Sequence, residues 1–267
     1  MKTILITGLD GSGKSTLLAR LQEQQSTASF EILFAPQIVT EGLAGDPSLM
    51  AAALFVNALG AEADRLELPQ FKAIALFASM LLFPKLLLAK QEKNPKTIFC
   101  ERHPLIDTGV YARFYAGKLG PNSIDPKILQ DLDRRFPHEL QYLLGLLPIQ
   151  YRPSDRSGLA AHLMDFIYQW FFMKKKYAPA DLQLLFGLPL PDFIYFLKAS
   201  PQTLYGRIRH RAIKEAHESP EVFKKLDGAY EALFAALEKD LPLRRVDAND
   251  LRQLDLLFEE IFQQQSA

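Results

Sequence analysis

One stretch near the start of the chain constrains the fold more than any other. It runs G-L-D-G-S-G-K-S-T from Gly8 to Thr16 and contains the full G-x-x-x-x-G-K-S pattern. A short apolar run, residues 2–7, precedes it, and leucines at helical spacing follow it in residues 17–21. This pattern indicates a phosphate-binding loop only where it lies between a strand and a helix, and the flanking residues predict both. We therefore predict a strand, a glycine-rich loop and a helix in succession.

The residue types in this loop are those that bind a phosphate group. Glycines let the backbone turn so that successive N–H groups point inward at an anion, and the following helix adds the positive end of its dipole. Lys14 is expected to reach the β and γ phosphates of ATP, and the Ser15 hydroxyl to bind Mg²⁺. An ordinary glycine-rich turn would explain neither this Lys-Ser pair nor the strand. The other loop residues expected to contact ATP are Gly8, Asp10, Gly11, Ser12, Gly13 and Thr16.

The rest of the chain alternates between apolar runs and helical patterns. Runs of strand character lie at residues 30–35, 97–100, 193–197 and 244–246, and helical segments separate them. Strands alternating with helices predict a parallel sheet that is covered on both faces. We expect an α/β fold of three layers, with five parallel strands, the first strand in the centre and the loop at its carboxyl end. The 267 residues show no repeat and no domain boundary, so we expect one domain.

Composition excludes several classes of protein. Hydrophobic residues make up 48% of the chain and charged ones 23%, which is typical of a globular protein, and the zero net charge argues against a nucleic-acid partner. A single cysteine, Cys100, allows no internal disulfide and fits the cytoplasm. The apolar stretch 74–89 is interrupted by Ser79, Pro84 and Lys85, so we expect a buried helix and no membrane span. No signal-peptide pattern opens the sequence.

The region 121–190 is less regular than the rest. Asp125 and Pro126 can cap a helix through Arg135, whereas the prolines at 137, 148 and 153 are expected to break helices. An aromatic-rich helix is expected over 159–177. Two roles stay open for this region: a cover for an acceptor site, or a subunit contact in a homodimer.

Four stretches, taken in order, resemble the thymidylate kinase family, a branch of the P-loop nucleoside and nucleotide kinases. The phosphate loop has the family's carboxylate at Asp10. The others are F-C-E-R-H at 99–103, similar to the family's Asp-Arg-Tyr/His motif; the segment 191–211, similar to its fourth strand and arginine-bearing lid; and V-D-A-N at 246–249, similar to its last strand and turn. The resemblance implies a single P-loop kinase domain over 1–267, with region 121–190 as an atypical helical insertion.

The resemblance implies transfer of a phosphoryl group from ATP, with Mg²⁺, to dTMP or a related acceptor. Glu101 follows a strand at the edge where ligands bind in such sheets, and a carboxylate there holds Mg²⁺ through water. Arg102 would pair with the acceptor's phosphate. Arg207 and Arg211 would form a lid that clamps the transferring phosphoryl group, while Arg209 fits a solvated helix face better. The plainer alternative for Glu101 and Arg102 is a surface ion pair.

The acceptor residues match the family less closely. Phe77 corresponds to the phenylalanine that stacks on thymine, with core packing as its alternative, and Tyr111 resembles the tyrosine near the acceptor sugar but is one residue out of step. Asp10 suits a sugar hydroxyl. Leu81 replaces a base-contacting arginine, and the segment 34–38, F-A-P-Q-I, lacks the Arg-Glu pair that the family has after its second strand.

The missing glutamate separates two kinds of kinase. Nucleoside kinases act on a neutral 5′-hydroxyl and use a carboxylate there as general base, whereas a monophosphate attacks with an oxygen that is already ionised. We therefore favour a monophosphate acceptor over a deoxynucleoside, although Glu101 or Glu41 could serve as base in a rearranged site. Two further alternatives are a P-loop switch that only hydrolyses nucleotide and a nucleotide-binding protein without kinase activity.

Overall fold

The structure is a computed structural model, and it describes residues 1–24, 30–35, 37–66, 68–155, 157–174, 179–210, 219–237 and 241–266. Its contacts divide the chain into two compact units. The first, which we call the sheet unit, comprises Met1–Phe34, Lys90–His103 and Leu190–Ala267. The second, the helical unit, comprises Ala35–Ala89 and Pro104–Pro189. Each unit is described by itself.

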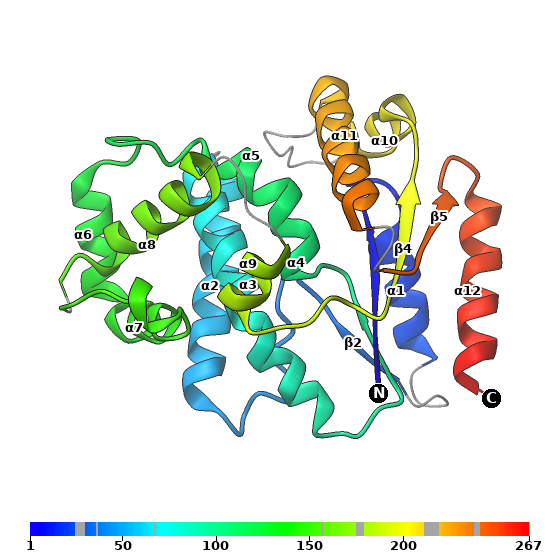
Figure 1. Cartoon of the computed structure of the whole chain (residues 1–267), viewed down its shortest axis with the longest axis horizontal. Coiled ribbons are helices and arrows are strands. Elements are labelled where there is room, and N and C mark those ends of the chain that lie inside the picture. Colours follow the sequence, from blue (N-terminus) through cyan, green and yellow to red (C-terminus); the bar gives the residue numbers. More distant parts are fainter. Residues whose placement is uncertain are drawn as a thin grey trace. The chain divides into compact units, whose positions relative to one another are not determined.

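The sheet unit contains a five-stranded parallel sheet with β1 in the centre, as predicted, and the strand order is β2-β3-β1-β4-β5. Figure 1 shows β5 beside β4. The central strand places Leu5 opposite Cys100 of β3 and Ile194 of β4, and all three side chains are fully buried. Continuous burial of this kind is typical of a parallel strand covered on both faces. The strands are β1 (Lys2–Gly8), β2 (Phe30–Leu33), β3 (Thr97–Cys100), β4 (Phe193–Lys198) and β5 (Leu243–Asp247).

Helices α1 (Lys14–Glu23), α10 (Pro201–Ile208), α11 (Pro220–Leu237) and α12 (Leu251–Ser266) pack around this sheet. Helix α1 packs on α12, and α10 packs on α11. Helix α11 buries one stripe at helical spacing, and its Tyr230 and Phe234 rings both contact Phe196 of β4. This packing fixes the end of the sheet from which the glycine-rich loop leaves.

The helical unit contains no strand among its described residues, and its two longest helices come first. These are α2 (Pro47–Arg65) and α3 (Pro69–Gln91, whose last two residues belong to the sheet unit). The others are α4 (Pro104–Asp107), the π-helix η2 (Thr108–Ala112), α5 (Arg113–Ala116), α6 (Pro126–Arg135), α7 (Pro137–Gly145), the 3₁₀-helix η3 (Ile149–Tyr151), α8 (Leu159–Ile167), the π-helix η4 (Tyr168–Met173) and α9 (Pro179–Phe186).

Helix α3 is long and apolar enough, by length and composition, to cross a membrane. Its most apolar window has a mean hydropathy of 1.8, but 78% of that window is buried inside the structure. Pro84 lies within the helix and does not end it. The burial agrees with the buried helix that we predicted, and the bounds Pro69–Gln91 lie within one residue of the helix that the sequence favours over 70–90.

Several predicted boundaries were wrong, for identifiable reasons. The sequence also favours a helix over 49–59 that ends at Gly60, but α2 runs through Gly60 to Arg65. Helix α6 ends at Arg135 ahead of Pro137, as expected, but Pro137 then begins a new helix, α7, since the first turn needs no N–H donor at that position. The sequence also favours one helix over 105–116, which η2 interrupts. The helix expected over 159–177 changes to η4 after Ile167, and its residues 175–177 lie outside the described residues.

Candidate nucleotide-binding site

The glycine-rich loop connects β1 to α1 within the sheet unit, and its backbone explains two of its glycines. Gly8 has φ 152°, and a Cβ on it would lie 2.4 Å from the Leu197 carbonyl oxygen of β4. Gly11 has φ 82°, and a Cβ there would lie 3.0 Å from the carbonyl oxygen of Leu204 in α10. Only glycine combines a positive φ with such close backbone approach. The loop is therefore held between β4 and α10.

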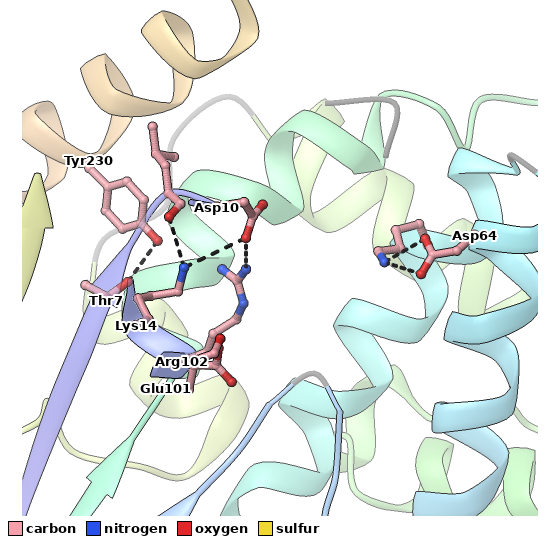
Figure 2. Close-up of polar contacts among 10 residues, drawn as sticks. Thr7, Asp10, Lys14, Asp64, Glu101, Arg102 and Tyr230 are labelled. Carbon is pink, nitrogen blue, oxygen red and sulfur yellow. Dashed lines mark hydrogen bonds and ion pairs between the residues drawn. The ribbon is translucent and has the colours of Figure 1, made fainter. Parts of the chain in front are cut away.

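Lys14 points back over the loop. Its buried Nζ donates a hydrogen bond to the Leu9 carbonyl oxygen at 3.1 Å and lies 3.8 Å from Asp10 Oδ1. Arg102 Nη2 lies 3.7 Å from the same Asp10 oxygen, so one carboxylate stands between two cations (Figure 2). The arrangement places Arg102, which is distant in the sequence, beside Asp10 and Lys14 of the loop.

Ser15 and Glu101 form a second polar pair beside the loop. Ser15 Oγ donates to Glu101 Oε1 at 2.8 Å. Glu101 directly follows β3, and its backbone N–H donates to the Leu33 carbonyl oxygen at 3.1 Å, which anchors this residue at the carboxyl edge of the sheet. A hydroxyl and a carboxylate at this distance fit Mg²⁺, which takes oxygen ligands and keeps several waters. Among the described residues there is no group of three or more His, Cys, Asp or Glu side chains arranged to hold a metal.

A buried hydrogen bond fixes the end of β1 just before the loop. Thr7 Oγ1 and the Tyr230 hydroxyl are 3.0 Å apart, and both side chains are fully buried (Figure 2). Tyr230 comes from α11, more than two hundred residues away, so no local pattern in the sequence pointed to it. His103, two residues after Glu101, is also buried, and this burial lowers its pKa to about 3. It is therefore neutral at physiological pH.

Of the two expected lid arginines, Arg207 and Arg211, the structure describes Arg207. Arg207 Nη1 donates to the Gly11 carbonyl oxygen at 3.1 Å, and Nη2 donates to the Asn249 carbonyl oxygen at 3.2 Å. Its predicted contact with a transferring phosphoryl group stays a prediction. Arg211 lies outside the described residues. The sequence pointed to Arg207 only through its place in the lid-like segment and not through these carbonyl partners.

The expected acceptor residues of the helical unit lie in its core. Phe77 is 1% exposed, and its ring contacts those of Phe166, Phe171 and Phe186 at centroid distances of 5.6, 5.2 and 6.2 Å. The three partners come from the region 121–190, so this region packs on α3. Tyr111, in η2, is 2% exposed. The packing of Phe77 agrees with the core alternative, and base stacking by this ring stays an untested prediction.

A parallel sheet in this order, with a phosphate loop between its first strand and first helix, is the P-loop kinase fold. The sequence matches no protein-family model and no curated protein. Similar solved structures include three of deoxyadenosine kinase from M. mycoides: with the products dCMP and a flexible dCDP, with dCTP, and with dATP. They are 20%, 19% and 20% identical to this chain, with TM-scores of 0.49, 0.48 and 0.46. The alignments cover 98% of this chain in each case, and 99%, 99% and 100% of theirs.

The thymidylate kinase-like assignment of the sequence stays a prediction. At these identities and TM-scores, the acceptor of this chain has to be judged from its own residues.

Proposed function

We propose that this protein is a P-loop phosphotransferase that moves the γ-phosphoryl group of ATP to an acceptor of the nucleoside class. One observation carries the proposal: Lys14 and the Ser15–Glu101 pair stand together at the loop between β1 and α1. A loop that only turned the chain would need neither a buried lysine nor a hydroxyl paired with a carboxylate. Phosphoryl transfer needs positioning and charge neutralisation, and these side chains supply both.

Each residue then has a definite task. The loop amides hold the β-phosphate, and Lys14 exchanges the Leu9 carbonyl oxygen for phosphate oxygens when ATP binds. Ser15 and Glu101 would hold Mg²⁺, which neutralises charge on the phosphates during transfer. Arg102 stands at the carboxyl end of β3 and orients the acceptor.

Arg102 bears on the choice between the two acceptors. The sequence favoured a monophosphate because the carboxylate expected after the second strand is missing, and Arg102 was then expected to pair with the acceptor's phosphate. Arg102 Nη2 instead lies 3.7 Å from Asp10 Oδ1, so a carboxylate already meets part of its charge. An Asp-Arg pair at this place suits hydroxyl groups of a sugar as well as it suits a phosphate. We therefore propose a deoxynucleoside as the first acceptor to test and a deoxynucleoside monophosphate as the second.

A two-way panel tests the proposal. ATP turnover is measured with Mg²⁺ alone, with each of the four deoxynucleosides, and with each of their monophosphates, and the products are identified by chromatography. We expect turnover that depends on acceptor, and loss of that turnover in Lys14→Ala. Arg252→Ala, at an exposed residue of the same unit, serves as a matched control for purification and folding.

The outcomes of this panel distinguish the proposed kinase from the alternative functions. A phosphorylated deoxynucleoside supports the hydroxyl acceptor, whereas products formed from monophosphates alone would return the preference to the thymidylate kinase-like reading. Acceptor-independent hydrolysis would indicate a P-loop switch. ATP binding without any turnover would indicate a nucleotide-binding protein, and the kinase proposal would then be wrong.

A further inference from the structure

We propose that Arg207 is a positioning residue that orients the Gly11–Ser12 peptide of the phosphate loop for nucleotide binding. This inference rests on the proposed function, because it requires that the loop bind a nucleotide. It differs from the lid role, in which Arg207 would contact the transferring phosphoryl group directly. The two roles predict different effects on a ligand that has no γ-phosphate.

The argument starts from one peptide plane. The Gly11 carbonyl oxygen accepts a hydrogen bond from Arg207 Nη1 at 3.1 Å, and the Ser12 N–H donates to the Leu9 carbonyl oxygen at 3.1 Å. In a trans peptide these two groups point in opposite directions. Arg207 therefore binds the Gly11 carbonyl oxygen on the side of this peptide that faces α10, and the Ser12 N–H points to the opposite side, toward the inside of the loop.

The inner side is where a phosphate binds. The Leu9 carbonyl oxygen accepts from both the Ser12 N–H and Lys14 Nζ, so two donors that suit a phosphate meet at one backbone oxygen. When a phosphate oxygen takes the place of the Leu9 carbonyl oxygen as acceptor, the Ser12 N–H loses its hydrogen bond to Leu9. The hydrogen bond from Arg207 to the Gly11 carbonyl oxygen remains. Arg207 is thus placed to keep the N–H directed inward while the ligand enters.

Arg207 itself is supported from several directions. Its Nη2 donates to the Asn249 carbonyl oxygen at 3.2 Å, in the turn between β5 and α12. The Asn249 side chain accepts from the Ser200 N–H at 2.9 Å and donates to Asp247 Oδ1 at 2.8 Å. Ser200 caps α10, the helix that carries Arg207. The turn is therefore bonded to α10 at its start and near its end.

Close packing adds to these hydrogen bonds. A Cβ on Gly11 would lie 3.1 Å from Ile208 Cγ2 as well as 3.0 Å from the Leu204 carbonyl oxygen, so α10 lies directly against the loop. A forked guanidinium can bridge two carbonyl oxygens, whereas an ammonium group on a flexible stem acts as a single point charge. A lysine at position 207 would therefore reproduce the charge but not the bridge.

The test measures the affinity of the whole protein for ADP by titration calorimetry. We expect Arg207→Ala to weaken ADP binding about ten-fold, as the loss of hydrogen bonds from a charged donor generally does. Arg207→Lys should give an intermediate loss. Inorganic tripolyphosphate should lose affinity by the same factor, since the effect acts on the phosphate loop. Arg252→Ala removes a charge from the same unit, at an exposed residue paired with Asp250, and should bind ADP like the wild type.

The kinetic readout separates positioning from a lid. Positioning predicts a higher KM for ATP with a smaller change in kcat, and thermal unfolding without nucleotide that stays close to the wild type. A large fall in kcat with unchanged ADP affinity would overturn the inference and support the lid role. Loss of ADP affinity in Arg207→Ala without loss of tripolyphosphate affinity would also overturn it. If the wild type bound no ADP, the proposed function itself would be wrong, and this result is distinct from both.

Discussion

Glu31 offers a quantitative test of how the sheet unit is stabilised, and the change is Glu31→Gln. The carboxylate lies on β2, is 6% exposed, and accepts from Lys90 Nζ at 3.1 Å and Lys93 Nζ at 3.0 Å. Burial alone would raise its pKa, but the two lysines outweigh burial and hold the pKa below its ordinary value of 4.5. Glutamine keeps the shape and loses the charge.

The magnitude follows from the two contacts. Hydrogen bonds to a charged group contribute about 1.5–3 kcal/mol each at most, and a partner in solvent contributes less. Lys90 is 19% exposed and Lys93 is 58% exposed, so Lys90 should dominate. We expect Glu31→Gln to lower the free energy of unfolding by about 2 kcal/mol at neutral pH. Lys90→Gln should cost more than Lys93→Gln.

The sign of the pH dependence is fixed by the lowered pKa. A carboxylate with a lowered folded pKa adds stability that is fully present above the unfolded value of 4.5 and is lost as pH falls through the folded value. The difference between wild type and Glu31→Gln, measured by urea unfolding with circular dichroism, should therefore shrink as pH falls below 4.5. The single tryptophan, Trp170, belongs to the helical unit, so its fluorescence is not the signal to use. A difference that is constant with pH, or that grows in acid, would refute the reasoning.

Four further substitutions test the loop and the core. Lys14→Ala should slow phosphoryl transfer about a hundred-fold or more, since one electrostatic contact in the transition state contributes about 3 kcal/mol, and wild-type turnover would contradict the assignment. Arg102→Lys should lower kcat/KM for the acceptor while ADP affinity stays nearly unchanged, because a point charge cannot replace a fork; equal losses for both ligands would contradict this. Phe77→Ala should lower the free energy of unfolding by about 3–5 kcal/mol, as truncation of a core phenylalanine does. Leu81→Arg places a charge at a site that is 2% exposed, so it should destabilise the protein and should not improve the use of thymidylate. Urea unfolding measures both changes in stability.

The sheet could be predicted from the sequence because most of its strands are short, largely apolar runs, although β5, L-R-R-V-D, exposes both of its arginines. Parallel pairing then follows from the alternation with helices. The helices of the region 121–190 were harder to predict. Pro137 and Pro179 stand at the first positions of α7 and α9, where proline favours a helix, but the same residue one turn later would break it.

The loop residues of the candidate site could also be predicted, since their spacing follows from backbone geometry. Ser15 and Glu101 were named separately, and the structure places them 2.8 Å apart because β1 and β3 are neighbours in the sheet. The Thr7–Tyr230 bond and the bridge from Arg207 to two carbonyl oxygens could not be predicted. Every residue has a backbone carbonyl oxygen, so the residue types do not indicate which of these oxygens accepts a hydrogen bond from a distant side chain.

Phe77 shows what a correspondence by position leaves open. Its distance before Glu101 matches that of a base-stacking residue, but the match gives its place along the helix and says nothing about its neighbours. In this chain α8, η4 and α9, all in the region 121–190, each bring an aromatic ring against it. A base-stacking role would therefore require the ring to pack in the core and to contact a ligand at once. Stacking on a base stays a prediction, and the stability of Phe77→Ala tests the packing of the ring.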